Sequence, residues 1–201
     1  MRLKQAGFDY GNERYQMKRI FIALKVEEGA TLLEMFSALK SALKNDIIKW
    51  TSIDNIHITL AFLGDTQESL INDISVMLAE KCHGYGKFSL TLKGCGIFRN
   101  FSDPRIIWTG IEPSSRLIAL NESIMTGLKM LNIKMEDRPY NPHLTLGRIK
   151  HLNDKDLLKH FIDRFLNIEL QTVPVSEVIL YESILTQSGP VYKPLAKFSL
   201  E

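Results

Sequence analysis

The segment HITL at residues 57–60 and its near copy HLTL at residues 143–146 decide the fold of this chain. About half of the chain separates the two copies, and each lies in a run of residues whose pattern predicts a β-strand. From the chain's own frequencies of histidine, threonine and leucine, chance produces two such copies less than about once in a thousand sequences. The repeat therefore indicates two related strands.

Within each copy the histidine and the threonine lie two residues apart, so on a strand they share one face. The apolar residues between them, Ile58 and Leu144, then point into the core. The next position on the polar face is small in both strands, which leaves space beside each pair. We therefore predict a single site whose catalytic residues are His57, Thr59, His143 and Thr145.

Two imidazoles and two hydroxyls suit the opening of a cyclic phosphodiester. The reaction needs a base that deprotonates water and an acid that protonates the leaving ribose oxygen, and histidine serves both roles near neutral pH. Threonine hydroxyls can donate to the non-bridging oxygens as the phosphorus becomes five-coordinate. A half-buried strand with a polar outer face explains either copy alone, but the pair favours a catalytic site.

A zinc site is the competing chemical interpretation of the same histidines. His57 and His143 lie in no local cluster with cysteine, aspartate or glutamate at ligand spacing, and each motif offers one good ligand. The cysteines, Cys82 and Cys95, form no CxxC pair and are too few for a disulfide framework. We therefore expect no metal, no other cofactor and a reduced, cytoplasmic setting.

Charge and hydropathy exclude other classes. The 25 basic residues nearly balance the 23 acidic ones, so the chain lacks the strong positive field of a protein that holds long nucleic-acid duplexes. No apolar run approaches the roughly 18 residues of a membrane-spanning helix, and the first residues do not resemble a secretion signal. We expect local contacts with nucleic acid and no contact with membranes.

Hydrophobic periodicity predicts alternating strands and helices with no linker between domains. Gly64 and the turn-forming residues at 100–104 mark two of the breaks, and Asn153 or Asp154 is expected to cap the last helix. Such a mixture of strand–helix units and hairpins predicts an α+β protein with largely antiparallel sheets. The expected strands are 18–26, 56–63, 87–98, 105–111, 143–149, 178–185 and 191–200, and the expected helices fall within 31–44, 70–78, 117–131 and 158–165.

In both motifs the chain resembles the RNA 2′,3′-cyclic phosphodiesterases, also called 2′-5′ RNA ligase-like proteins, of the two-histidine phosphoesterase superfamily. The likeness extends over about residues 18–200. The segments that carry it are KRIFIAL at 18–24, Trp50, HITLAFLGD at 57–65, GIFRNFSDPRIIWTGI at 96–111, RPYNPHLTLGR at 138–148, VILYESIL at 178–185 and Tyr192.

The resemblance implies a bilobal fold with two pseudo-symmetric lobes and a central cleft between the two motif strands. The lobes are interleaved, one built from both termini and the other from the middle of the chain, so residues 17–201 are expected to form a single domain. Residues 1–16 have no counterpart in the resemblance, and we interpret them as an N-terminal extension. The active-site roles transfer to the two histidines and two threonines of the motifs.

Three further residues are candidates for substrate binding. Arg148 ends the second motif, where it would aid phosphate binding, although an ideal strand places it on the side of Leu144 and Leu146, where an edge or packing role is the alternative. Phe21 and Tyr140 are candidates for stacking on a base, with a place in the core as the alternative.

The resemblance implies hydrolysis of RNA 2′,3′-cyclic phosphate ends to 2′-phosphates. Because the 3′ oxygen then leaves, we assign His143 as the base and His57 as the acid. The absence of a ligand cluster predicts that the reaction needs no metal, and because the two-lobe site needs no second chain, we expect a monomer. Two rival functions use the same fold: a ligase that joins RNA ends by the reverse reaction, and a non-catalytic binder of RNA ends. Intact motifs argue against the binder. Expected partners are RNA ends or small nucleotides that carry the cyclic phosphate.

Overall fold

A computed structural model describes residues 16–135, 139–187 and 189–201. The extension expected at residues 1–16 therefore lies outside the described residues except for Gln16, whose carbonyl accepts a hydrogen bond from the Glu68 amide at 2.9 Å. The strands are β1 (Met17–Lys25), β2 (Ile47–Trp50), β3 (His57–Gln67), β4 (Phe88–Phe98), β5 (Ile106–Ile111), β6 (His143–His151), β7 (Glu169–Val175), β8 (Glu177–Thr186) and β9 (Gly189–Ser199). The helices are α1 (Ala30–Ala42), α2 (Ile71–Cys82), α3 (Ser115–Met130) and α4 (Lys155–Phe165), with short 3₁₀ turns η1 (Ile53–Asn55) and η2 (Glu68–Leu70).

Helix boundaries follow from the sequence through apolar spacing and caps. In α1 the residues Leu32, Met35, Phe36 and Leu39 repeat at helical intervals and are buried. Of the two predicted caps for α4, Asp154 holds the position, and its carboxylate accepts a hydrogen bond from the Leu157 amide at 2.8 Å.

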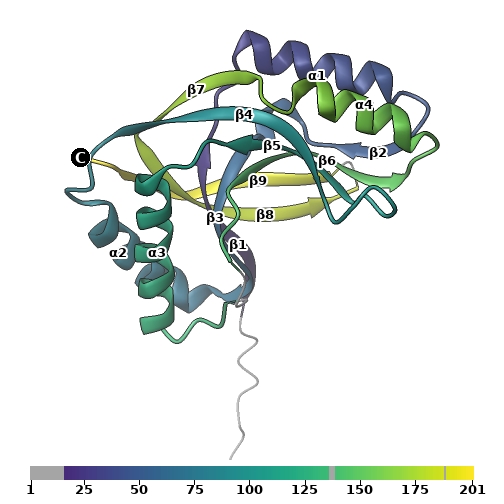
Figure 1. Cartoon of the computed structure of the whole chain (residues 1–201). Helices are drawn as coiled ribbons and strands as arrows, with labels where there is room; N and C mark the ends of the chain where they lie inside the picture. The colour runs from purple at the N-terminus through teal and green to yellow at the C-terminus, as the bar shows by residue number, and fades with distance from the viewer. Residues whose placement is uncertain (1–15, 136–138, 188) are drawn as a thin grey trace, which may run out of the picture.

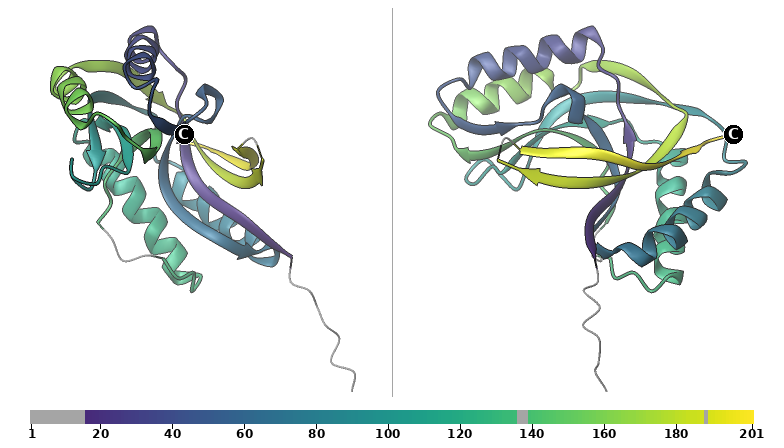
Figure 2. Two further views of the ribbon diagram at one scale, coloured as in Figure 1. Left: turned by 90° about the vertical axis from the view of Figure 1, so that its right-hand side faces the viewer. Right: turned by 180° about the vertical axis from the view of Figure 1, so that it is seen from behind.

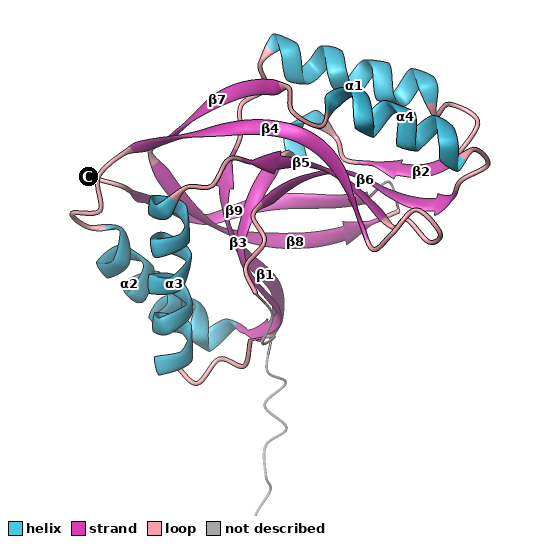
Figure 3. Cartoon of the chain, in the orientation of Figure 1, coloured by secondary structure: helices cyan, strands magenta, loops and turns pink. Residues whose placement is uncertain are grey.

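The described strands form one curled sheet with the order β7-β4-β5-β6-β3-β1-β8-β9, in which β2 pairs with β6 as well (Figures 1 and 3). Each of these pairings is antiparallel, which confirms the predicted α+β class. The order is symmetric about the junction of β6 with β3. We call β3-β1-β8-β9 the terminal half and β7-β4-β5-β6 with β2 the central half.

The helices are exchanged between the halves. Helix α1 follows β1 of the terminal half but contacts β7 of the central half, where it lies beside α4 (Figures 1 and 2). Helix α3 follows β5 of the central half but contacts α2 and β3. The Gly29 amide, at the start of α1, donates to the Gln171 side chain on β7 at 2.8 Å. This exchange binds the two halves together through one continuous core.

The sequence analysis did not predict two of the strands, β2 and β7. Strand β2 has only four residues, and β7 is a partly polar segment that carries Pro174 as its next-to-last residue. Proline donates no ladder hydrogen bond and is tolerated on edge strands, and β7 lies at the edge of the sheet. Strand β2 is too short, and the alternation of β7 too irregular, for either to be identified as a strand from local sequence.

The end of β3 was also predicted wrongly, because the strand continues past Gly64 to Gln67. Phe21 pairs with Phe62 and Ile20 pairs with Gly64, so Leu63 is an extra residue that forms a β-bulge. Gly64 adopts a φ of +70°, which glycine tolerates without a side-chain clash. The glycine that predicted a break instead bends a continuous strand.

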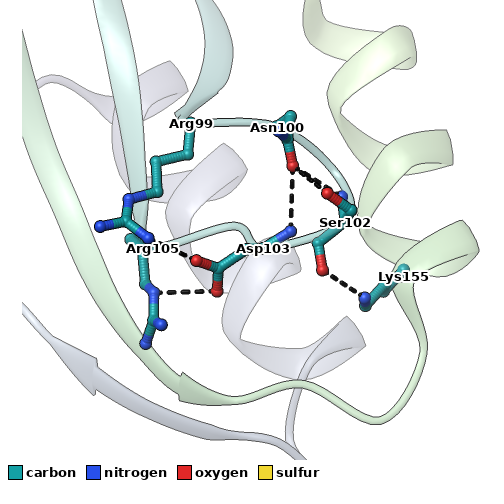
Figure 4. A network of polar contacts seen from close by, with 6 residues as sticks. All are labelled: Arg99, Asn100, Ser102, Asp103, Arg105 and Lys155. Carbon is teal, nitrogen blue, oxygen red and sulfur yellow. Dashed lines mark hydrogen bonds and ion pairs between the residues drawn. The ribbon is translucent and has the colours of Figure 1, made fainter.

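The predicted hairpin of β4 and β5 is present, and its loop has its own polar network (Figure 4). The Asn100 side-chain oxygen accepts hydrogen bonds from the amides of Ser102 and Asp103 at 3.0 and 3.1 Å. The Asp103 carboxylate pairs with Arg99 and with Arg105, which fixes both ends of the loop. This loop directly follows Phe98, which contacts the second motif histidine.

Candidate active site

Strands β3 and β6 meet where Ile58 pairs with Leu144, and both side chains are fully buried. Residues alternate along a strand, so the neighbours of this pair point to the opposite face, which we call the helix-free face. His57, Thr59, His143 and Thr145 all lie there and are partly exposed. Because the strands are antiparallel, His57 lies toward Thr145 and Thr59 lies toward His143. The structure thus brings the four predicted residues together in this diagonal arrangement.

Both histidine rings are held in the same way. The Nδ1 atom of His57 lies 2.7 Å from the carbonyl oxygen of Asn55, and the Nδ1 atom of His143 lies 2.8 Å from that of Asn141. A carbonyl oxygen only accepts, so Nδ1 carries the proton and donates in each case. The neutral form then has its free electron pair on Nε2. Each ring therefore leaves Nε2 free to exchange a proton with a ligand or with water.

Both histidine pKa values are lowered. For His57 the main cause is burial, which the Asn55 carbonyl opposes, and the charge of His143 lowers the pKa further. For His143 burial is again the main cause, the Asn141 carbonyl opposes it, and the charge of Arg148 lowers the pKa further. A positive charge on one group near the site lowers the pKa of the histidine beside it, so simultaneous protonation of His57 and His143 is unfavourable.

Aromatic rings support both imidazoles. The ring of Tyr192 meets His57 edge-on at 5.2 Å, and the ring of Phe98 meets His143 edge-on at 4.6 Å. Phe21 lies 5.0 Å from His57 but is only 3% exposed, packed against Tyr181 and Tyr192. A buried ring offers no face to a base, so the structure does not support base stacking by Phe21. The Phe21 ring instead packs beside the His57 ring.

Tyr140 likewise contacts the protein. Its hydroxyl donates to the carbonyl oxygen of Thr59 at 3.3 Å, and its ring packs against the core. Burial raises the pKa of this phenol, which keeps the donor protonated. The contact ties the segment before β6 to β3 and supports a positioning role rather than base stacking.

Arg148 leaves the sheet on the opposite side from the one that an ideal strand predicts. Thr145 pairs with Trp108 and Gly147 pairs with Ile107, so Leu146 is an extra residue on β6. A bulge of this kind shifts the alternation by one position. Leu146 is buried while Arg148 is exposed, and Arg148 thus shares the helix-free face with the motif residues. The packing alternative for Arg148 is therefore wrong.

The hydroxyls of Thr59 and Thr145 form no hydrogen bond within the described part of the chain and remain available to a ligand.

The residues that hold the histidines, Asn55 and Asn141, were not predicted, although the sequence carried a signal: asparagine stands two positions before the histidine in both motifs. Asn55 has a second role, because its side-chain amide donates to the Pro190 carbonyl at 2.9 Å and holds β9 beside His57.

No group of three or more histidine, cysteine, aspartate or glutamate side chains in the described residues has the geometry to hold a metal ion. Similarly, none of the described helices has the length and hydropathy needed to cross a membrane.

Comparison with known proteins agrees with this geometry. The model of the 2′-5′ RNA ligase superfamily matches residues 54–184, which include both motifs. The chain belongs to this superfamily. It is similar to the RNA 2′,3′-cyclic phosphodiesterase of Methanothermobacter thermautotrophicus, to which it is 34% identical over 90% of this chain and 98% of the relative. The protein of the same name from Thermotoga maritima is 35% identical over 91% of this chain and 96% of the relative.

Solved structures of other proteins share the fold. The protein TT0787 of Thermus thermophilus is 26% identical and superposes with a TM-score of 0.74 over 90% of this chain and 97% of that protein. LigT of E. coli in complex with 3′-AMP is 22% identical, with a TM-score of 0.71 over 92% of this chain and 99% of LigT. The predicted family and fold are therefore confirmed.

Proposed function

We propose that this protein hydrolyses 2′,3′-cyclic phosphate ends of RNA to 2′-phosphomonoesters. The observation that carries the proposal is the pair of histidines on adjoining strands, each fixed through Nδ1 so that Nε2 is free, and each beside a threonine hydroxyl. Relatives that span nearly the whole chain are named RNA 2′,3′-cyclic phosphodiesterases. Both motifs are intact, which argues against a protein that only binds RNA ends.

In the proposed mechanism, the Nε2 atom of His143 takes a proton from water as the oxygen attacks phosphorus. The bond from phosphorus to the 3′ oxygen breaks on the opposite side, and the protonated Nε2 of His57 delivers a proton to that oxygen. The hydroxyls of Thr59 and Thr145 donate to the non-bridging oxygens, and Arg148 balances their negative charge. The 2′ oxygen keeps the phosphate.

The electrostatics of the pair suit this division of labour. One histidine must be neutral and the other protonated before the reaction begins, and the charge of one ring lowers the pKa of the other. A bound phosphate supplies negative charge that favours one proton in the site, while the mutual repulsion disfavours a second. The singly protonated pair is therefore the reactive state.

The same four residues would catalyse the reverse reaction, in which a 5′-hydroxyl of RNA replaces water. Hydrolysis is the favoured direction because water is present in great excess over RNA ends.

Each motif offers one free imidazole nitrogen and one hydroxyl, which supports a reaction without a metal. Both motifs belong to one chain, which supports a monomer.

We also propose a cytoplasmic setting. Cys82 and Cys95 are buried free thiols, which suits a reducing compartment. Burial raises the pKa of Cys82 to about 11 and that of Cys95 to about 12, so both remain protonated and unreactive near neutral pH.

Product analysis tests the proposed reaction. Purified protein is incubated with adenosine 2′,3′-cyclic phosphate, and 2′-AMP is resolved from 3′-AMP by chromatography. We expect 2′-AMP; predominant 3′-AMP would show that the ribose binds in the other orientation.

A substrate with a 3′-thiolate leaving group needs little protonation, so it should rescue His57→Ala and leave His143→Ala inactive. The opposite pattern would exchange the two roles.

A further inference from the structure

Three exposed cations continue the helix-free face beyond the second motif. Arg148 and Lys150 flank Ile149, which is 6% exposed and belongs to the core, so their side chains leave the sheet on the same side. Lys49 on β2 lies directly opposite Arg148 in the β2–β6 pairing. We call Lys49, Arg148 and Lys150 the basic row.

Like charges directly opposite one another destabilise a sheet, so the pairing of Lys49 with Arg148 needs a reason. Some other strand lysines of this chain pair with carboxylates, such as Lys18 with Glu68 at 3.0 Å and Lys93 with Glu112 at 2.7 Å. Within residues 16–135, 139–187 and 189–201, no member of the basic row has an acidic partner. An anionic ligand would relieve the repulsion.

The members of the basic row lie at different distances from the reacting groups. The charge of Arg148 acts on both His143 and Tyr192, which packs on His57, so Arg148 belongs with the scissile phosphate. Lys49 lies one strand further out. Its Nζ atom lies 3.9 Å from the position that a Cβ atom would take at Gly189, the first residue of β9. Lys49 therefore occupies the rim, next to the site but outside it.

The chemistry of the substrate determines which anion reaches the rim. An RNA that ends in a 2′,3′-cyclic phosphate has no phosphate beyond the ring, so every other phosphate lies on the 5′ side of the terminal nucleotide. We propose that Lys49, assisted by Lys150, binds the phosphate on the 5′ oxygen of that nucleotide. The inference rests on the proposed function and deepens it: the preferred substrates are RNA ends and 5′-phosphorylated nucleotides, rather than cyclic nucleosides that lack this group.

The test compares two substrates that differ by one phosphate, adenosine 2′,3′-cyclic phosphate and its 5′-phosphorylated form. The readout is the ratio of kcat/KM for the second substrate to kcat/KM for the first, so any general change in activity cancels. We expect the wild-type ratio to be about 5, the upper range for an ion pair at an exposed site. Lys49→Gln should lower the ratio roughly fivefold, and Lys49→Arg, which keeps the charge, should preserve it.

Lys129→Gln is the matched control, because Lys129 is exposed at the end of α3, which lies at the opposite end of the molecule from β2 (Figure 1), and its substitution removes the same charge. Its ratio should equal that of the wild type. A Lys49→Gln ratio within twofold of the wild type would overturn the inference, as would an equal loss in Lys129→Gln, which would indicate a general effect of net charge. If wild-type protein hydrolyses neither substrate, the proposed function itself fails and the inference fails with it.

Discussion

Phe21 offers the sharpest test of how the site is held, because base stacking and support of His57 predict different kinetics. The ring is 3% exposed and lies within 5.1 Å of His57, Tyr181 and Tyr192, measured between ring centroids. Phe21→Ala removes this support. His57 would then keep only its hydrogen bond to the Asn55 carbonyl and its edge contact with Tyr192.

The size of the effect follows from burial. Replacing a buried phenylalanine with alanine costs about 3–5 kcal/mol, and the lower end applies because this cluster is small and separate from the main core. At about 2–4 °C per kcal/mol for a protein of this length, the melting temperature should fall by about 6–12 °C. A displaced imidazole should lower kcat by about 100-fold. Phe21→Leu keeps most of the volume and should lose less than about 1.5 kcal/mol.

The assay compares adenosine 2′,3′-cyclic phosphate with ribose 2′,3′-cyclic phosphate, which has no base, at a temperature where the variants remain folded. Support of His57 predicts that Phe21→Ala lowers kcat by the same factor on both substrates. A loss confined to the adenosine substrate, appearing mainly in KM, would refute this reasoning and restore base stacking as the role of Phe21.

Four further predictions follow from the site. His57→Ala and His143→Ala should each lower turnover by about 10²- to 10⁴-fold with little change in the circular dichroism spectrum, and near wild-type turnover in either would refute the acid–base pair. Thr59→Val and Thr145→Val should lower kcat less than either histidine variant; a larger loss would make the hydroxyls the main catalysts. Activity should survive excess chelator, whereas loss with chelator and rescue by zinc would require a metal mechanism. Because burial lowers both histidine pKa values below 6.5, the unfolded state binds more protons as the pH falls through this value, and stability is lost there. Urea unfolding at pH 7 and pH 5 should therefore show a smaller loss for a His57→Gln, His143→Gln double variant than for the wild type, and an equal or larger loss would contradict the lowered pKa values.

Sequence by itself determined the two His-x-Thr motifs and most of the secondary structure. Both depend on local pattern: a period of two residues places His57 with Thr59 on one face of a strand, and helical spacing buries Leu32, Phe36 and Leu39. The cap of α4 is local as well, although the sequence left Asn153 and Asp154 as alternatives. These features depend on near neighbours in the chain, so they can be predicted without knowledge of the fold.

Only the tertiary structure determined which further residues lie near the two motifs. The bulge at Leu146 arises from register with β5, and it turns Arg148 from the core side to the active-site face. Burial of Phe21 depends on strands β8 and β9, which lie far away in the sequence. The short strand β2 exists because β6 offers it an open edge beyond Leu144, and this pairing places Lys49 opposite Arg148. Register, edges and burial depend on partners distant in the chain, so local pattern does not encode them.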